Sequence, residues 1–320
     1  MRTEVQHAST AVDVLGEPYT ATTFTLTPDA EGEVVATLIR KAAPVRTDHA
    51  VLYVHGFCDY FFQTELAEFW NAQGYDFYAL DLRKYGRSLR AHQTPCYVED
   101  LTTYYEELDF AWAVITDDHP DVVVSGHSTG GLVVSLWLND RRHAPSGVVL
   151  NSPWLAMQGD FFTRTALMAA VDGIGRRNPR WVLPRNVNGF YGESLHRRFG
   201  GEWDFDLAWK PLDSFPVRAG WVRAIRAGHA RVARGLDVQA PVLVLASSKS
   251  AMPRLGSDPA IHTSDIVLDV EQIRRRAPLL GEHTTMVMLE GALHDVVLSA
   301  APVRKRAYEE IDRFLMYVAN

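Results

Sequence analysis

The sequence predicts an α/β fold in which helices cover both faces of a mostly parallel central sheet. Short apolar runs rich in β-prone residues recur along the chain, at 50–54, 76–80, 121–125, 147–151, 241–246 and 284–289. Amphipathic segments of helical length separate most of these runs, for example at 64–74, 100–118 and 305–319. Strands that alternate with helices pair mainly in parallel, because each helix carries the chain back across one face of the sheet.

The N-terminal region follows a different pattern. Residues 19–42 alternate in polarity around Asp29-Ala30-Glu31-Gly32, and this alternation predicts an antiparallel hairpin. At 320 residues the chain is longer than a usual single domain, and one α/β core with a sizeable insertion fits this length. We therefore expect the antiparallel hairpin to extend an otherwise parallel sheet.

The alternation of strands and helices stops between about residues 153 and 238. This segment is rich in Arg, Trp, Gly and Pro, with helix-like stretches at both ends. We therefore divide the chain into an N-terminal part of the core (1–152), an inserted lid (153–238) and a C-terminal part of the core (239–320). The inserted segment contains 12 Arg and 1 Lys against 5 Asp and 2 Glu between residues 155 and 236, a formal charge of +6. These cations are expected either to pair with acidic core residues or to attract an anionic or interfacial substrate.

Composition excludes several classes of protein. Hydrophobic residues make up 47% and charged residues 22%, which is typical of a globular protein. The formal net charge of −7 argues against nucleic-acid binding, because a phosphate backbone would repel it. The N-terminal stretch lacks the apolar core of a signal peptide, and no stretch reaches the roughly 18 apolar residues of a membrane span. We expect a cytoplasmic protein without an integral membrane segment.

Cofactor and metal motifs are absent from the sequence. It contains no CxxC pair, HExxH, EF-hand loop or Walker-type phosphate loop, so we expect no metal and no cofactor. The two cysteines, Cys58 and Cys96, are expected to be free thiols, because a core of this size needs no disulfide. The sequence gives no indication of the oligomeric state.

The stretch VVVSGHSTGGLVVSLWL, residues 122–138, joins a predicted strand directly to a predicted helix. The joint has the pattern Gly-x-Ser-x-Gly, in which a sharp turn exposes the serine hydroxyl above the sheet. Gly126 and Gly130 leave room for this turn, because a side chain at either position would meet the neighbouring strand or helix. Ser128 is therefore the candidate nucleophile. Thr129 begins the helix, where unpaired backbone N–H groups favour negative charge.

A serine needs a base, and the base needs a carboxylate to orient it. His294 lies in LEGALHDVVLS, just after the last predicted strand, and is the candidate base. The acid is expected soon after the strand at 241–246, but an insertion intervenes there. Asp265 follows this insertion and is the preferred candidate, with Asp258 and Asp269 as alternatives; Asp269 also resembles a helix N-cap.

The loop His55-Gly56-Phe57 follows the first central strand and is expected to pass over the serine. The backbone N–H groups of Phe57 and Thr129 are the candidate oxyanion hole. Candidate substrate contacts are His55, Gly56, His127 and Trp154. Aromatic residues of the insertion are expected either to line an apolar site or to pack the insertion on the core: Phe161, Phe162, Trp181 and Trp203.

Together, His55-Gly56-Phe57, ALDLRKYGRS, Gly126-His127-Ser128-Thr129-Gly130-Gly131 and GALHD resemble the α/β-hydrolase superfamily. Within it they are similar to the lysophospholipase and monoacylglycerol-lipase group of serine aminopeptidase type. The resemblance covers residues 45–155 and 238–318. It implies an α/β-hydrolase fold with Ser128 as nucleophile, His294 as base, Asp265 as acid, and Phe57 and Thr129 as oxyanion donors. One departure is Lys84-Tyr85, which stands where the family usually has Gly and His.

The expected activity is that of a serine hydrolase. We expect it to cleave carboxylic esters of small apolar or lipid-like acyl groups through an acyl-enzyme. Peptidase, thioesterase, lactonase and carbon–carbon bond hydrolase activities use the same triad and are alternatives, as is transfer to an acceptor other than water. A binding protein that has kept the fold and lost its chemistry is a further alternative.

Overall fold

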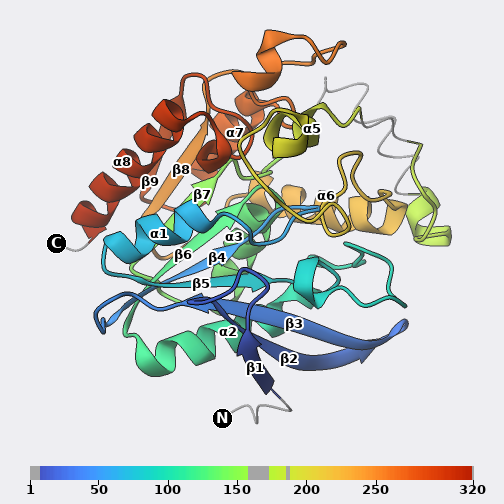
Figure 1. Cartoon of the computed structure of the whole chain (residues 1–320). Helices are drawn as coiled ribbons and strands as arrows, with labels where there is room; N and C mark the ends of the chain where they lie inside the picture. Colours follow the sequence, from blue (N-terminus) through green and yellow to red (C-terminus); the bar gives the residue numbers. More distant parts are fainter. Residues whose placement is uncertain (1–7, 158–172, 185–187, 319–320) are drawn as a thin grey trace.

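The computed structural model describes residues 8–157, 173–184 and 188–318, which form a nine-stranded sheet covered by helices (Figure 1). The strands are β1 (Ala8–Val12), β2 (Thr20–Asp29), β3 (Gly32–Lys41), β4 (His49–Val54), β5 (Asp76–Asp81), β6 (Asp121–His127), β7 (Gly147–Asn151), β8 (Val242–Ser247) and β9 (Thr284–Leu289). The order in the sheet is β1-β2-β3-β5-β4-β6-β7-β8-β9.

Strand direction divides the sheet into two parts. The strands β1, β2, β3 and β5 pair antiparallel, whereas β5, β4, β6, β7, β8 and β9 are parallel. The six predicted central strands and the hairpin are confirmed. The edge strand β1 was not predicted, because its sequence ASTAV is short and lacks an apolar alternation; its residues are exposed.

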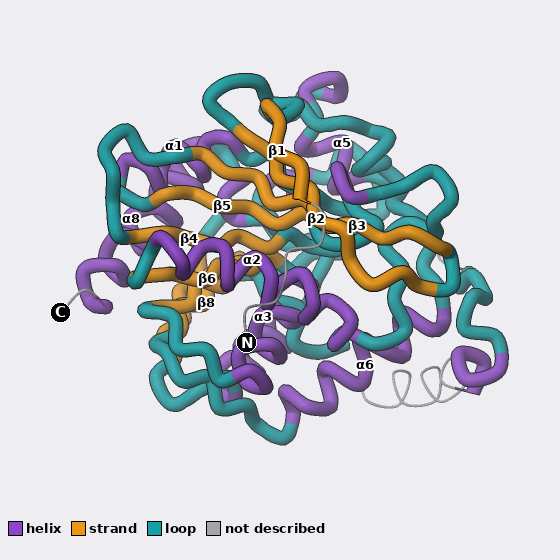
Figure 2. The backbone as a smooth tube through the Cα atoms, turned by 90° about the horizontal axis from the view of Figure 1, so that it is seen from below, coloured by secondary structure: helices purple, strands orange, loops and turns teal. Residues whose placement is uncertain are grey.

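Helices cover both faces of the sheet (Figure 2). The α-helices are α1 (Thr64–Ala72), α2 (Tyr105–Asp118), α3 (Thr129–Arg141), α5 (Phe190–Leu195), α6 (Ala219–Ala233), α7 (Val270–Arg276) and α8 (Ala301–Val318). Short 3₁₀ helices lie at Gly86–Ser88, Leu101–Tyr104, Arg197–Phe199, Pro259–His262, Ala277–Leu279 and Val296–Leu298. The three helices expected at 64–74, 100–118 and 305–319 are confirmed.

Alternate residues of the central strands point to opposite faces of the sheet and build two cores. On β4, Val51 and Tyr53 pack with α1 and α8, whereas Leu52 and Val54 pack with α2, α3 and α6. These strand residues are at most 1% exposed. Burying such a side chain contributes about 1.5–3 kcal/mol each. The continuous apolar runs in the sequence reflect burial on both faces.

The insertion connects β7 to β8, which are neighbours in the sheet. Its helix α6 packs tightly on α3, since an added Cβ at Gly228 would lie 3.0 Å from Leu136. This helix matches the predicted helical stretch at the C-terminal end of the insertion. The stretch at the other end, with Phe161 and Phe162, lies outside the described residues. The exact boundaries of the insertion at 153 and 238 stay a prediction.

Whether a helix can span a bilayer depends on its length and its apolar character. None of the helices in the described ranges combines the two as a membrane crossing requires.

Candidate active site

Ser128 occupies a sharp turn between β6 and α3. Its backbone has φ 53° and ψ −118°, an uncommon conformation for a residue with a side chain, and α3 begins at the next residue. Such strain persists only where the surrounding structure enforces it. The backbone N–H of Ser128 donates to Asn151 O at 3.0 Å, and its carbonyl accepts from Trp154 N at 2.9 Å. Strand β7 and the residues after it therefore hold the turn in place.

The glycines around this turn are required by close packing. A Cβ at Gly130 would lie 2.3 Å from the carbonyl oxygen of His55, and one at Gly126 would lie 2.8 Å from Val134 Cγ2. The contact at Gly130 is with the backbone of His55, which cannot shift without displacing the end of β4 and the loop after it. The start of α3 is therefore pressed against the loop that follows β4, and only glycine at position 130 permits this approach.

His294 and Asp265 lie in line with the serine. His294 Nε2 is 2.9 Å from Ser128 Oγ, and His294 Nδ1 is 2.9 Å from Asp265 Oδ2. The Asp265 side chain is fully buried, and its other oxygen accepts the N–H groups of Val267 and Leu268 at 2.8 and 2.7 Å. These bonds fix the carboxylate, which in turn fixes the imidazole with its Nε2 toward the hydroxyl.

Asp265 reaches this position although it lies 18 residues beyond the last residue of β8, Ser247. Its N–H donates to Lys249 O at 3.0 Å and its carbonyl accepts from Ala251 N at 2.9 Å, so the chain leaves the sheet after β8 and returns to the same place. The alternatives lie elsewhere: Asp258 caps a 3₁₀ helix through Ala260 N, and Asp269 caps α7 through Glu271 N.

The loop after β4 touches the serine. A Cβ at Gly56 would lie 3.0 Å from Ser128 Cβ, and the ring of Phe57 packs against that of Trp221 in α6, with the ring centres 4.2 Å apart and the planes tilted by 39°. His55 is 1% exposed; its Nε2 accepts from Leu82 N, so its Nδ1–H donates to Gly56 O at 2.8 Å. The His55 ring thus positions the loop through both nitrogens, and the predicted contacts of His55 and Gly56 with substrate stay predictions.

His127 and Trp154 flank the serine. The His127 ring is 4.9 Å from the His294 ring and its Nδ1 lies 3.1 Å from Asn151 O. Burial is the main reason why the pKa of His127 is lowered, which keeps the ring neutral. Trp154 is partly buried, and its ring lies 5.8 Å from that of Trp221. Both residues adjoin the site, and their contact with substrate stays a prediction.

A buried polar network lies behind the two histidines, and most of it was not predicted from the sequence. Asp59, His127 and Asp295 have ligand atoms within 4.8 Å of one another, which is compatible with a metal ion. The carboxylates already have partners, since Lys210 Nζ lies 2.6 Å from Asp59 and Asn151 Nδ2 donates to Asp295 at 2.6 Å. The arrangement is therefore an ion pair and a hydrogen-bond network.

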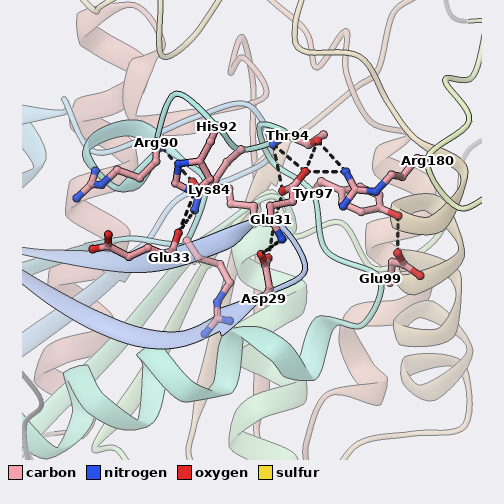
Figure 3. Close-up of polar contacts among 12 residues, drawn as sticks. Asp29, Glu31, Glu33, Lys84, Arg90, His92, Thr94, Tyr97, Glu99 and Arg180 are labelled. Carbon is pink, nitrogen blue, oxygen red and sulfur yellow. Dashed lines mark hydrogen bonds and ion pairs between the residues drawn. The ribbon is translucent and has the colours of Figure 1, made fainter.

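A second polar cluster joins the insertion to the β2–β3 hairpin (Figure 3). Glu31 in the hairpin turn contacts Lys84 Nζ, Thr94 Oγ1 and Arg180 Nη1, each at 2.6 Å. Burial alone would raise the pKa of Glu31, but these hydrogen bonds outweigh it and lower the pKa to about 2. Lys84, at the position where the sequence departs from the family pattern, also contacts Asp29 at 2.5 Å. That departure therefore supplies an anchor for the hairpin.

The fold and the turn at Ser128 define the class of protein. A mostly parallel sheet with a serine in a strained turn between β6 and α3 is the α/β-hydrolase arrangement. A monoacylglycerol lipase of Paleococcus ferrophilus shares this fold, with a TM-score of 0.66 and 20% identity over 88% of this chain and 98% of that one. A soluble variant of monoglyceride lipase from Saccharomyces cerevisiae matches with a TM-score of 0.68 and 14% identity, over 92% and 96%.

Sequence comparison identifies the family. The chain belongs to the serine aminopeptidase (S33) family of hydrolases, whose family model matches residues 46–299. It is also similar to phospholipase YtpA of Bacillus subtilis (strain 168), with 33% identity over 112 residues. That match spans 34% of this chain and 41% of the Bacillus protein, less than half of the relative's length. The resemblance to serine aminopeptidase-type hydrolases is confirmed.

Proposed function

We propose that the protein hydrolyses carboxylic esters through a covalent acyl-enzyme on Ser128. The single observation that carries this proposal is the continuous line of contacts from Asp265 through His294 to Ser128, with both heavy-atom distances at 2.9 Å. Membership of a hydrolase family and the strained turn at the serine support it further.

The proposed reaction uses this geometry. His294 takes the proton of Ser128 as its oxygen attacks the ester carbonyl carbon, and Asp265 stabilises the resulting imidazolium. The N–H groups of Phe57 and Thr129 stabilise the oxyanion, each by about 3–4 kcal/mol. His294 then donates the proton to the departing alcohol. Water, activated by the same imidazole, hydrolyses the acyl-enzyme and releases the acid.

The substrate we propose has an apolar or lipid-like acyl group. Support comes from the aromatic rings of Phe57, Trp221 and Trp154, which form a continuous apolar cluster that begins at the oxyanion loop. We further propose that the insertion is a lid over Ser128. Trp203 does not belong to this cluster, since it packs against a separate one that includes Tyr60 and Leu298, and its Nε1–H donates to Leu298 O at 2.9 Å. Trp181 is 37% exposed on the surface.

Labelling with a fluorophosphonate tests the nucleophile. The wild-type protein is expected to react at one serine, and Ser128→Ala is expected to abolish the labelling while the protein stays folded by circular dichroism. Labelling at another residue would contradict the proposal. The reagent mimics the tetrahedral intermediate, so its reaction requires an activated serine rather than an exposed one.

A substrate panel tests the reaction type. It contains p-nitrophenyl esters of rising chain length, monoacylglycerols, lysophospholipids, an acyl thioester and aminoacyl p-nitroanilides. We expect kcat/KM for the best oxygen ester to exceed that for any anilide or thioester by about tenfold or more. Preference for an anilide or a thioester would overturn the proposed ester specificity and leave the role of Ser128 intact.

A further inference from the structure

One segment of the insertion, from Phe190 in α5 to Lys210, bridges two loops that come from opposite ends of the chain. One is the oxyanion loop, residues 55–62, and the other is the histidine loop, residues 290–300. Apolar side chains of all three segments form one cluster: Tyr60, Phe62, Leu195, Phe205, Leu293 and Leu298, with Tyr191, Trp203, Leu207 and Trp209 packed against it. Figure 1 shows α5 above the sheet, between α7 and α6. We call residues 190–210 the bridging segment.

The bridging segment holds the histidine loop by hydrogen bonds. The hydroxyl of Tyr191 accepts the backbone N–H of Asp295 at 3.1 Å, and the Tyr191 ring lies edge-on to the His294 ring at 5.8 Å. Trp203 donates to Leu298 O at 2.9 Å. Two side chains of the bridging segment thus hold the backbone of the histidine loop after His294, at Asp295 and at Leu298.

The bridging segment holds the oxyanion loop by an ion pair. Lys210 Nζ lies 2.6 Å from Asp59 Oδ1, and the two side chains are 11% and 3% exposed. Asp59 lies two residues after Phe57, the proposed oxyanion donor. A second bond runs from the N–H of Asp206 to the hydroxyl of Tyr60 at 2.7 Å. The buried pair is the more demanding contact, because removal of either partner leaves an uncompensated charge.

The charges of Lys210 and Asp59 act on His127, which is a neighbour of His294. Asp59 and Asp295 favour protonation of His127 and Lys210 opposes it, and the His127 ring is 4.9 Å from that of His294. Although burial acts against ionisation, the charge and the hydrogen bond of Lys210 outweigh it and lower the pKa of Asp59, so the carboxylate is charged at neutral pH. The polar groups that face or adjoin His294 are Ser128, Asp265, His127, Asp295 and Tyr191, with Asp59 and Lys210 behind them.

We propose that Lys210 and Tyr191 are positioning residues of the active site, although both come from the insertion. Lys210 holds Asp59, and with it the N–H of Phe57, while Tyr191 holds the backbone next to His294. The bridging segment therefore sets the distance between the oxyanion donor and the base, and balances the buried charge beside the base. This inference depends on the proposed roles of Ser128, His294 and Phe57.

The test uses full-length protein with p-nitrophenyl butyrate as substrate. Lys210→Met is expected to lower kcat by about tenfold to a hundredfold while KM stays within about twofold, because the lost contact affects the transition state. In this variant the uncompensated Asp59 carboxylate favours the protonated form of His294. The acidic limb of the plot of kcat/KM against pH is therefore expected to move to higher pH by about 0.5 pH unit. Asp59→Asn leaves the ammonium of Lys210 unpaired, and the acidic limb of this variant is expected to move to lower pH.

The double variant Lys210→Met/Asp59→Asn separates this role from simple packing. Restored charge balance is expected to return the acidic limb to the wild-type position and to recover at least about fivefold in kcat over Lys210→Met. The matched control is Arg197→Met, whose partner is Asp204 in an exposed pair with side chains 66% and 64% accessible, and it should behave as wild type. Wild-type kcat and pH profile in Lys210→Met, or a double variant without recovery, would overturn the inference.

Tyr191→Phe keeps the test valid if Lys210→Met fails to fold. It removes only one hydroxyl, and kcat is expected to fall by about threefold to tenfold with unchanged KM. Tyr308→Phe is its control, because the Tyr308 hydroxyl is buried without a hydrogen-bond partner in the described structure. Equal kcat in both Phe variants would contradict the role of Tyr191. Absence of fluorophosphonate labelling in the wild type would instead contradict the proposed function.

Discussion

The turn at Ser128 and the bridging segment both contact His294, yet they are specified in different ways. The turn depends on residues adjacent in sequence, whose glycines allow β6, α3 and the loop after β4 to meet at backbone distance. The bridging segment depends on single side chains that meet residues about 100 or more positions away, such as Tyr191 with Asp295. A short motif can therefore determine the turn that presents Ser128, whereas the surroundings of His294 depend on tertiary contacts.

Two of the ion pairs that the insertion makes with the core show a similar contrast. Lys210 and Asp59 are both buried beside the active site, whereas Arg180 is 45% exposed where it meets Glu31 at the hairpin turn. Desolvation makes the first pair sensitive to any unbalanced charge, and solvent screens the second. We expect the inner pair to control turnover and the outer pair to contribute to stability alone.

The largest expected effect concerns Asp265, the proposed acid. Asp265→Asn keeps the size of the side chain but removes the charge that orients and stabilises the imidazole of His294. We expect kcat for p-nitrophenyl butyrate to fall by about 10²- to 10⁴-fold, with little change in the unfolding midpoint. Asp269→Asn is the control, because asparagine caps a helix nearly as well as aspartate. A wild-type rate in Asp265→Asn would move the acid to another carboxylate.

The next effect tests the backbone packing at the turn. Gly130→Ala places a Cβ 2.3 Å from the carbonyl oxygen of His55, and this backbone contact cannot be relieved by a side-chain rotation. We expect a loss of about 3 kcal/mol or more in the free energy of unfolding, measured by urea titration. Gly173→Ala is the matched control, since its Cβ meets no described atom within 4 Å. Equal stability of the two variants would show that the turn accommodates a methyl group at position 130, contrary to what its geometry indicates.

These contrasts also explain how much the sequence could predict. The apolar runs predicted the five inner parallel strands because these are buried on both faces, and the half-buried edge strand β9 still carries the apolar run MVML. The glycines around Ser128 marked the turn. Ser128, His294 and Asp265 could be singled out as candidates because chain order and strand ends restrict where such groups can lie, and their roles stay predictions. Strand β1 was missed because an exposed edge strand has no apolar pattern.

The surroundings of the site left weaker signals in the sequence. Asp295 is adjacent to His294 and could have been singled out, but nothing local indicates that Lys210 pairs with Asp59, 151 positions away. Charge counting predicted that cations of the insertion would either pair with the core or attract an anion. The described pairs Arg180 with Glu31, Lys210 with Asp59 and Arg231 with Asp140 support the first alternative.

The smallest expected effect concerns the outer pair. Glu31→Gln removes the charge that Lys84 and Arg180 share, and we expect a loss of about 1–2 kcal/mol in the free energy of unfolding at pH 7. Because folding lowers the pKa of Glu31 from 4.5 to about 2, its contribution is fully present above pH 4.5 and is lost as the pH falls through 2. Urea titrations across this range should therefore show a flatter pH dependence for the variant than for wild type.

The exposed neighbour Glu33 supplies the control, since Glu33→Gln alters the same hairpin without removing a partner of Lys84 or Arg180. Its unfolding curves should follow those of wild type at every pH. Turnover of p-nitrophenyl butyrate by Glu31→Gln should stay within about twofold of wild type, because the hairpin turn lies outside the oxyanion and histidine loops. If Glu31→Gln instead lowered kcat as strongly as Lys210→Met, both ion pairs would act on the active site. The burial of an ion pair would then not determine whether it affects turnover or only stability.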